Sequence, residues 1–216
     1  MEKLHINYEC LGNYAMPKFF KNENLTMVDI GCNAGNFVSK YLNALDKIHY
    51  YEINPILFSY LKDKFNDNKH ILGFNEGVSN NDNLNVEILK HSSNDAGSVS
   101  LNNNEQIIIK EWNEILGFIN TVSLETVLKR CNGYINYLKM DCETSEYNIL
   151  INKDLSNIEF LSIEIHWQLG KERWDELLRH ICTYFFDYGN QNTSYDTNIK
   201  NKELNFINKK SQNIIS

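Results

Sequence analysis

A turn near the start of the chain has the residue types of a ligand-binding loop. Residues 26–31 form a short apolar run typical of a buried strand, and apolar residues at helical spacing follow over 36–45. Between them, Gly31 and Gly35 let the backbone bend sharply and approach a ligand closely. Their spacing around Asn33 is not the Gly-x-Gly-x-x-Gly of dinucleotide enzymes, and the Gly-Lys-Ser/Thr of a P-loop is missing. The pattern therefore indicates a binding turn different from both of these.

Two carboxylates accompany this turn. Asp29 lies two residues before the first glycine, where it would repel a pyrophosphate but order the loop or accept hydrogen bonds from a cationic amino acid. Glu52 belongs to a second apolar run, residues 48–53, about 20 residues further on, and an acid there can bind both hydroxyls of a ribose. A ribose joined to an amino acid, without phosphate, describes S-adenosylmethionine. A tight turn beside a surface acid is the alternative interpretation.

A group of ionisable residues follows the next predicted buried strand, residues 134–141. Alternation places Lys139, Asp141 and Glu143 on one side of the extended segment. Because unpaired charges are costly to bury, these three side chains need either solvent or a ligand. A lysine–aspartate pair, with Glu146 beginning the following helix, is the structural alternative.

The last candidate group ends a long apolar run, residues 158–167, which is typical of a strand in the middle of a sheet. Glu164 and His166 share one face of it, and histidine is the side chain best suited to remove a proton near neutral pH. We therefore take His166 and Asp141 as candidate general bases, with Glu164 orienting His166. A structural role for a core histidine stays open. Asp141, Glu143 and Glu164 offer, as a secondary hypothesis, oxygen ligands for a divalent cation.

Strands and helices alternate along most of the chain, which predicts one α/β domain over residues 1–216 with a mostly parallel sheet and helices on both faces. Small residues and asparagines interrupt the alternation, so a hairpin or an irregular insertion is expected over 80–110. Residues 1–20 are the candidate for an N-terminal substrate lid, with packing on the sheet as the alternative. Further strands are expected over 70–74, 184–188 and 204–207, and helices over 55–65, 123–128, 145–151 and 172–182.

Composition limits the classes of function. The 216 residues carry a formal charge of −7, which disfavours a general nucleic-acid binder. Five cysteines without CxxC spacing, and histidines without ligand spacing, predict neither a disulfide framework nor a metal centre. No segment is typical of a signal peptide or of a membrane span, so we expect a cytoplasmic protein that binds neither nucleic acid nor membrane. The oligomeric state stays open, although homodimers are common.

In their order and spacing, these blocks resemble the FkbM-type family of S-adenosylmethionine-dependent methyltransferases. The segments that carry the resemblance are residues 28–35, 51–55, 121–125, 138–146 and 163–166. The resemblance implies a Rossmann-like class I methyltransferase fold: a seven-stranded, mostly parallel sheet with one antiparallel strand near the C-terminus. One departure is Thr144, which stands where the family usually has a glycine after the second acid of its fourth-strand motif.

The resemblance also implies an activity. S-adenosylmethionine would donate a methyl group to a hydroxyl of a small molecule, most often a carbohydrate such as a sugar or a nucleotide-linked sugar. The alternatives are methylation of a nitrogen or of RNA, and a non-catalytic cofactor-binding protein of the same fold. A nicotinamide-dependent oxidoreductase is a further alternative, which the missing third glycine of the turn disfavours.

By resemblance, each block receives an expected contact with the cofactor. Asp29, Gly31 and Gly35 would border its methionine part, and Glu52 would hold its ribose. The segment after the third strand would lie along the adenine, and Asp141 would lie near the reacting methyl group. The full set of expected cofactor-binding residues is Asp29, Gly31, Asn33, Gly35, Asn36, Glu52, Ile53, Gly77, Val78 and Asp141.

Overall fold

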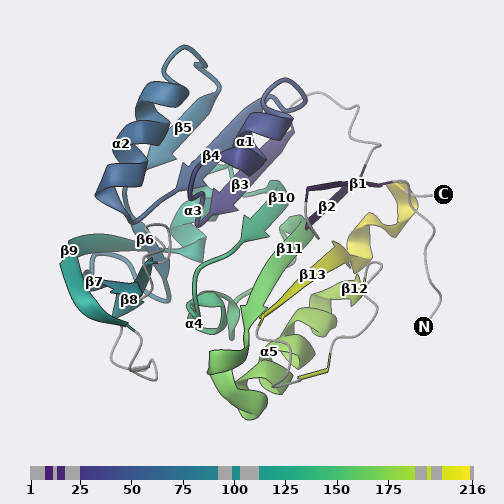
Figure 1. The fold of residues 1–216 in the computed structure, drawn as a ribbon. Coiled ribbons are helices and arrows are strands. Elements are labelled where there is room, and N and C mark those ends of the chain that lie inside the picture. Colours follow the sequence, from purple (N-terminus) through teal and green to yellow (C-terminus); the bar gives the residue numbers. More distant parts are fainter. Residues whose placement is uncertain are drawn as a thin grey trace.

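The fold is built around one large β-sheet. The computed structural model describes residues 8–11, 14–17, 25–91, 99–102, 112–187, 194–195 and 201–214. The strands of the large sheet are β3 (Thr26–Ile30), β4 (Lys47–Tyr51), β5 (Ile71–Phe74), β10 (Ile135–Met140), β11 (Ile158–His166), β12 (Phe185–Asp187) and β13 (Asn201–Asn208). Within the described residues, these seven strands lie in the order β12-β13-β11-β10-β3-β4-β5 (Figure 1).

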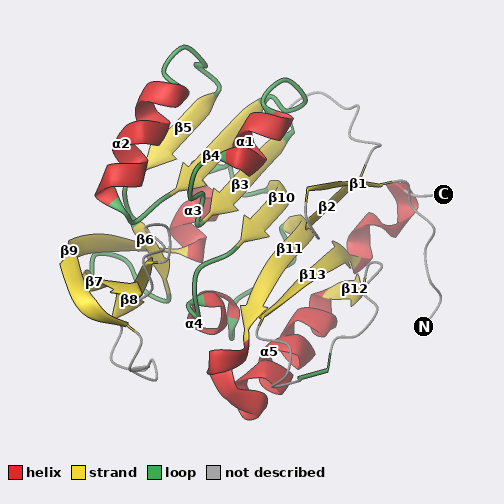
Figure 2. Ribbon diagram, viewed as in Figure 1, coloured by secondary structure: helices red, strands yellow, loops and turns green. Residues whose placement is uncertain are grey.

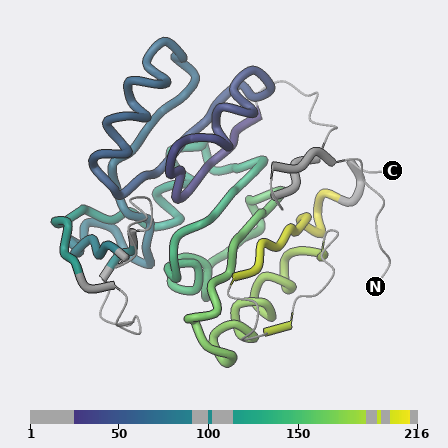
Figure 3. The backbone as a smooth tube through the Cα atoms, in the orientation of Figure 1, coloured from purple at the N-terminus to yellow at the C-terminus, as the bar shows by residue number. Residues whose placement is uncertain are grey.

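The direction of the strands confirms the predicted fold class. Strand β13 runs antiparallel to both of its neighbours, whereas the other neighbouring pairs are parallel. The backbone trace in Figure 3 shows that the early part of the chain builds one half of the sheet and the late part builds the other. The halves meet where β3 pairs with β10. In open α/β sheets, ligands bind at such a switch point, outside the carboxyl ends of the strands.

Helices cover both faces of the sheet (Figure 2). They are α1 (Asn36–Tyr41), α2 (Pro55–Lys64), α3 (Leu124–Arg130), α4 (Glu146–Leu150) and α5 (Gly170–Tyr184), with the 3-10 helices η1 (Trp167–Leu169) and η2 (Lys209–Ile214). Apolar residues of α1 and α2 pack with Met27, whereas those of α3, α4 and α5 pack with Val28. Because successive side chains of a strand point to opposite faces, these are two core layers, one on each face. No helix among the described residues is both long and apolar enough to cross a membrane.

Two helices begin at the capping residues that the sequence offers. The side chain of Ser123 accepts a hydrogen bond from the backbone N–H of Thr126 at 3.2 Å and so caps the start of α3. Asn54 does the same for the N–H of Ile56 at 3.0 Å, and Pro55 occupies the first turn of α2. The capping residues Asn54 and Ser123 therefore define where α2 and α3 begin.

A smaller sheet stands beside the carboxyl ends of the large one. Its strands are β6 (Gly77–Ser79), β7 (Asn85–His91), β8 (Val99–Asn102) and β9 (Trp112–Ser123), in the order β6-β9-β7-β8. Strands β7 and β8 pair antiparallel in the region where a hairpin or an irregular insertion is expected. Strand β9 has no counterpart in the sequence prediction. Its residues Ile115, Leu116 and Phe118 are all exposed, so the alternation from which a strand is predicted is missing.

The N-terminal residues that the structure describes form an antiparallel pair, β1 (Tyr8–Leu11) with β2 (Tyr14–Pro17). Strand β2 contacts β11 and β13 of the large sheet. The rest of residues 1–20, the segment for which a lid is expected, lies outside the described residues.

Candidate functional site

A pocket opens at the switch point between β3 and β10. It encloses about 560 Å³, including the part open to solvent. Its walls come from the ends of β3, β4 and β10, from the segment after β5 and from β8 of the small sheet. The lining residues are Ile30, Gly31, Asn33, Tyr51, Glu52, Ile53, Glu76, Val78, Leu101, Asp141, Cys142, Glu143 and Ser145. The pocket therefore lies where the parallel topology places a ligand.

The turn after β3 has a backbone conformation at Gly31 and Gly35 that is unfavourable for residues with a side chain. Gly31 has φ +78°, and a Cβ atom there would lie 1.8 Å from the carbonyl oxygen of Asp141. Gly35 has φ +73°, and its Cβ would lie 2.5 Å from a methyl group of Leu61 in α2. Both glycines are therefore required by the fold. Only Gly31 lines the pocket, because Gly35 faces the packing between α1 and α2.

Asp29 lies beneath this turn rather than in the pocket wall. Its carboxylate is fully buried and lies 3.1 Å from Nζ of Lys139, which also donates a hydrogen bond to the carbonyl of Gly31 at 2.8 Å. Burial raises the pKa of Asp29, and the ammonium of Lys139 opposes that rise. Burial disfavours the charged ammonium as well, but Asp29 and Asp141 raise the pKa of Lys139 above its usual value. The pair therefore joins β3, β10 and the turn.

Glu52 presents a fixed carboxylate to the pocket. One oxygen accepts a hydrogen bond from the backbone N–H of Asn33 at 2.7 Å, and the other accepts one from Asn54 at 2.8 Å. Burial raises the pKa of Glu52 to about 7, although these two N–H groups oppose the rise. Since each carboxylate oxygen can accept two hydrogen bonds, both keep capacity for the hydroxyls of a ligand.

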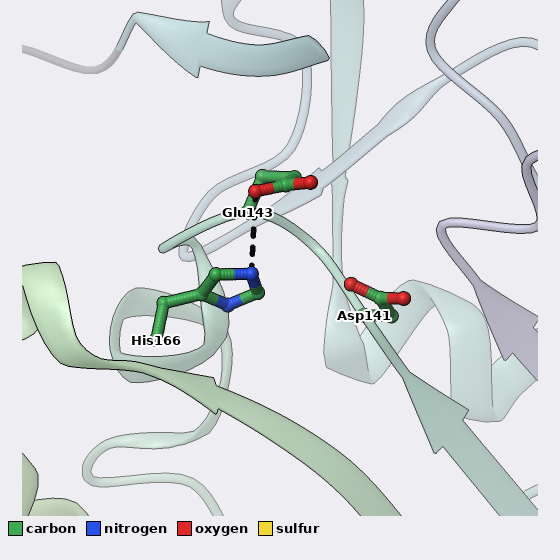
Figure 4. A group of neighbouring side chains, drawn as sticks. All are labelled: Asp141, Glu143 and His166. Atoms are coloured by element: carbon green, nitrogen blue, oxygen red, sulfur yellow. Dashed lines mark ion pairs between the residues drawn. The ribbon is translucent and has the colours of Figure 1, made fainter. Parts of the chain in front are cut away.

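Five side chains gather at the other end of the pocket, and we call them the histidine–carboxylate cluster: Asp141, Glu143, Glu146, Glu164 and His166. His166 is only 1% exposed. Its Nδ1 lies 2.8 Å from Oε1 of Glu146, and its Nε2 lies 3.2 Å from Oε2 of Glu143 (Figure 4). Although burial opposes a charged ring, these two carboxylates raise the pKa of His166 well above its usual value. Both ring nitrogens therefore face an acceptor.

Asp141 and Glu164 form the second part of the cluster. Burial, together with the neighbouring charge and hydrogen bond of Asp141, raises the pKa of Glu164 to about 7. Two carboxyl groups joined by a hydrogen bond cannot both be ionised without cost, so Glu164 keeps its proton to a higher pH than a free glutamate does. One ligand atom from each of Asp141, Glu143 and His166 lies within 4.8 Å of the others.

The turn that carries Glu143 holds two residues in left-handed conformation. Glu143 has φ +49° and Thr144 has φ +82°. Such a φ is unfavourable for a β-branched residue and free of steric cost for glycine. Thr144 therefore has a backbone conformation that a glycine would adopt without steric cost.

Six of the ten expected cofactor-binding residues line the pocket, and four do not. The expected cofactor residues that line the pocket are Gly31, Asn33, Glu52, Ile53, Val78 and Asp141, whereas Asp29, Gly35, Asn36 and Gly77 are not among the lining residues. His166 and Glu164 lie behind Asp141 and Glu143 rather than in the wall.

Several lining residues are absent from the set of expected cofactor-binding residues. One of them, Glu76, belongs to residues 76–79, the segment after the third predicted strand that is expected along the adenine. Both guanidinium nitrogens of Arg130 bind the Glu76 carboxylate, and the guanidinium lies 4.4 Å from the ring centre of Phe74. Leu101 belongs to β8 of the small sheet, and the sequence around it gives no signal for a binding site.

Comparisons with known proteins give one match to a family. The methyltransferase FkbM domain matches residues 29–191. No curated protein sequence matches the chain.

Solved structures with a similar fold include three methyltransferases. The 23S rRNA methyltransferase ErmE has 9% identity over 87% of this chain and 63% of its own, with a TM-score of 0.41. An rRNA methylase from Streptococcus thermophilus has 10% identity over 87% and 88%, with a TM-score of 0.46. TrmK of M. capricolum, in complex with S-adenosyl-homocysteine, has 11% identity over 87% and 64%, with a TM-score of 0.41. The chain therefore spans less than two thirds of ErmE and of TrmK.

Proposed function

Because the chain belongs to the FkbM family of S-adenosylmethionine-dependent methyltransferases, we propose that it methylates a hydroxyl group of a small carbohydrate, such as a sugar or a nucleotide-linked sugar. The observation that carries the proposal is the histidine–carboxylate cluster at the end of the pocket. A neutral hydroxyl is a poor nucleophile and must lose its proton, and the cluster supplies carboxylates to receive it. Carboxylates also accept hydrogen bonds from the several hydroxyls of a sugar.

The pocket residues fit S-adenosylmethionine. Glu52 has the position and the remaining acceptor capacity for the two ribose hydroxyls. Ile53, Val78 and Leu101 supply apolar surface for the base, and the backbone of the Gly31 turn is open to the amino-acid part. When bound, the cofactor would supply a methyl group activated by a sulfonium, and the sulfur would leave as a neutral thioether.

The chain's own residues then have two tasks, alignment and proton removal. Holding the hydroxyl in line with the methyl carbon lowers the entropic cost of the reaction. As the oxygen–carbon bond forms, the hydroxyl proton passes to the Asp141–Glu164 pair. The geometry favours this pair over His166, because an imidazole whose pKa is raised by Glu143 and Glu146 already carries its proton. In this proposal His166 is a positioning residue that holds the two glutamates.

Transfer of a labelled methyl group tests the proposal. The purified chain is incubated with methyl-labelled S-adenosylmethionine and a panel of free sugars, nucleotide-linked sugars, amines and RNA. We expect label on a carbohydrate oxygen, and a loss of about 10²-fold in Glu164→Gln with cofactor affinity kept. Glu125→Gln, which alters an exposed carboxylate paired with Lys153, is the matched control. Label only on RNA or on an amine, or cofactor binding without any transfer, would contradict the proposal.

A further inference from the structure

We propose that His166, Asp141 and Glu143 form a binding site for one divalent transition-metal cation beside the cofactor pocket. The site stands on its own geometry, whereas the role given below to the cation rests on the proposed function. One ligand atom of each residue lies within 4.8 Å of the other two (Figure 4). The residues converge because β10 and β11 are parallel neighbours, with Met140 opposite Ile163, so that their carboxyl ends meet.

The histidine is held in the way that metal ligands are held. Nδ1 of His166 lies 2.8 Å from Oε1 of Glu146, and the same oxygen accepts the backbone N–H of Cys142 at 3.2 Å. Glu146 is itself fully buried. A buried carboxylate behind one ring nitrogen fixes the ring and directs the other nitrogen forward, as in carboxylate–histidine–metal arrangements. The site is therefore more than a collection of surface acids.

The forward nitrogen points at two carboxylates that a cation can reach. Nε2 of His166 lies 3.2 Å from Glu143, whose side chain is 27% exposed, and Asp141 is 31% exposed. The nearby ammonium of Lys139 lies closer to Asp29, at 3.1 Å, than to Asp141, at 3.9 Å. Four carboxyl groups thus surround one imidazole. A divalent cation on Nε2 would take the place of the proton and compensate the carboxylates from the pocket side.

The ligand set indicates the class of cation. Imidazole suits zinc and similar transition metals, while carboxylates suit manganese, magnesium and calcium. One nitrogen and two carboxylates therefore favour Mn²⁺ or Zn²⁺ over the all-oxygen preference of Mg²⁺. Three protein ligands leave coordination positions open. A hydroxyl of the acceptor bound there would lose its proton more readily, and the Asp141–Glu164 pair of the proposed function would receive that proton.

Electron paramagnetic resonance with Mn²⁺ tests the site without any reaction. The full chain is freed of metal with a chelator, and Mn²⁺ alone is titrated in. We expect one bound Mn²⁺ per chain, and at least tenfold weaker binding in Glu143→Gln and in His166→Asn. Asp67→Asn, which alters an exposed carboxylate after α2, is the matched control and should bind as the parent does. Because His166 is buried, the partly exposed Glu143 decides the test, with circular dichroism checking the fold.

Two results would overturn the site: no bound Mn²⁺ at millimolar concentration, or equal binding in Glu143→Gln and the parent. Equal displacement of Mn²⁺ by Mg²⁺ would overturn the transition-metal assignment. Calorimetry with S-adenosylmethionine on the same metal-free protein separates this proposal from the proposed function. Normal cofactor binding with no Mn²⁺ binding contradicts only the metal site, whereas Mn²⁺ binding without cofactor binding contradicts only the proposed function.

Discussion

The two ends of the pocket hold their charges in different ways. At the glycine turn, each buried carboxylate has a fixed partner of the opposite kind: Asp29 has the ammonium of Lys139 at 3.1 Å, and Glu52 has two backbone N–H groups at 2.7 and 2.8 Å. These partners belong to the fold, and none of them is supplied by a ligand. This end is therefore preorganised.

At the opposite end, carboxyl groups face each other. Asp141 and Glu164 share a hydrogen bond, and Glu143 and Glu146 compete for the charge of one imidazole, that of His166. Their ionisation depends on one another and on any proton or cation that enters. This contrast fits the proposed function, in which the glycine end binds the cofactor and the histidine–carboxylate cluster faces the acceptor.

Removing the ammonium from the glycine end should have the largest effect. Lys139→Met leaves Asp29 buried without its cation, so we expect a loss of about 3–5 kcal/mol in the free energy of unfolding. Lys153→Met, which breaks the more exposed pair with Glu125, should cost about 1 kcal/mol or less. Urea denaturation measures both. Equal losses would mean that the buried pair is no more important to the fold than a surface pair.

The glycine turn itself offers the second test. In Gly31→Ala the new methyl group meets the backbone of Asp141 in addition to an unfavourable φ, so we expect a loss of about 3 kcal/mol and much weaker cofactor binding. Gly133→Ala is the matched control, because its φ is +85° but its Cβ would meet nothing within 4 Å. That variant should lose only about 1–2 kcal/mol. Similar losses in the two variants would show that the backbone contact at Gly31 is unimportant.

The sequence predicts the first end of the pocket better than the second for a physical reason. Continuous apolar runs identify β3 and β11, and parallel topology alone brings the residues after β3, β4 and β10 to one edge. The positions of Gly31 and Glu52 follow from this. The protonation of His166 does not, because it depends on two carboxylates whose distances are set by a left-handed turn at Glu143.

Strand β9 of the small sheet was the other part that the sequence could not predict. Strand β9 exposes adjacent apolar residues, Ile115 and Leu116, and its register against β7 shifts between Ile88 and Leu89. An irregular strand of this kind is defined by its partners rather than by its own pattern. Leu101 reaches the pocket wall only because this sheet packs there, so local periodicity carries no information about it.

The hydrogen bond between Asp141 and Glu164 should also be visible in the dependence of stability on pH. The pKa of Glu164 is raised to about 7, so between about pH 4.5 and 7 the folded chain holds more protons than the unfolded chain. The free energy of unfolding therefore falls as pH rises through this range. Glu164→Gln should remove part of this fall. At pH 8 we expect the variant to be more stable than the parent by only about 1 kcal/mol, because the side chain remains partly hydrated. At pH 4.5, where Glu164 of the folded parent is protonated, we expect no gain.

A carboxylate with the opposite shift provides the contrast for this measurement. Asp82 accepts the backbone N–H of Ser123 at 2.6 Å, which lowers its pKa, so its contribution is present above its usual pKa and is lost as pH falls. Asp82→Asn should therefore be less stable than the parent at pH 8. Urea denaturation at both pH values measures the two variants. Parallel pH curves for the parent and Glu164→Gln would show that the pKa of Glu164 is not raised in the folded chain.

The smallest expected effect concerns the turn that positions Glu143. At ordinary helical or extended positions alanine is as stable as glycine or more stable, but at φ +82° the order should reverse. We therefore expect Thr144→Gly to be more stable than Thr144→Ala by about 1 kcal/mol, since both remove the same buried side chain and only glycine relieves the backbone. Thermal unfolding of the two variants measures the difference. If alanine proves equal or better, the left-handed turn does not persist in solution, and the distance between Glu143 and His166 loses its support.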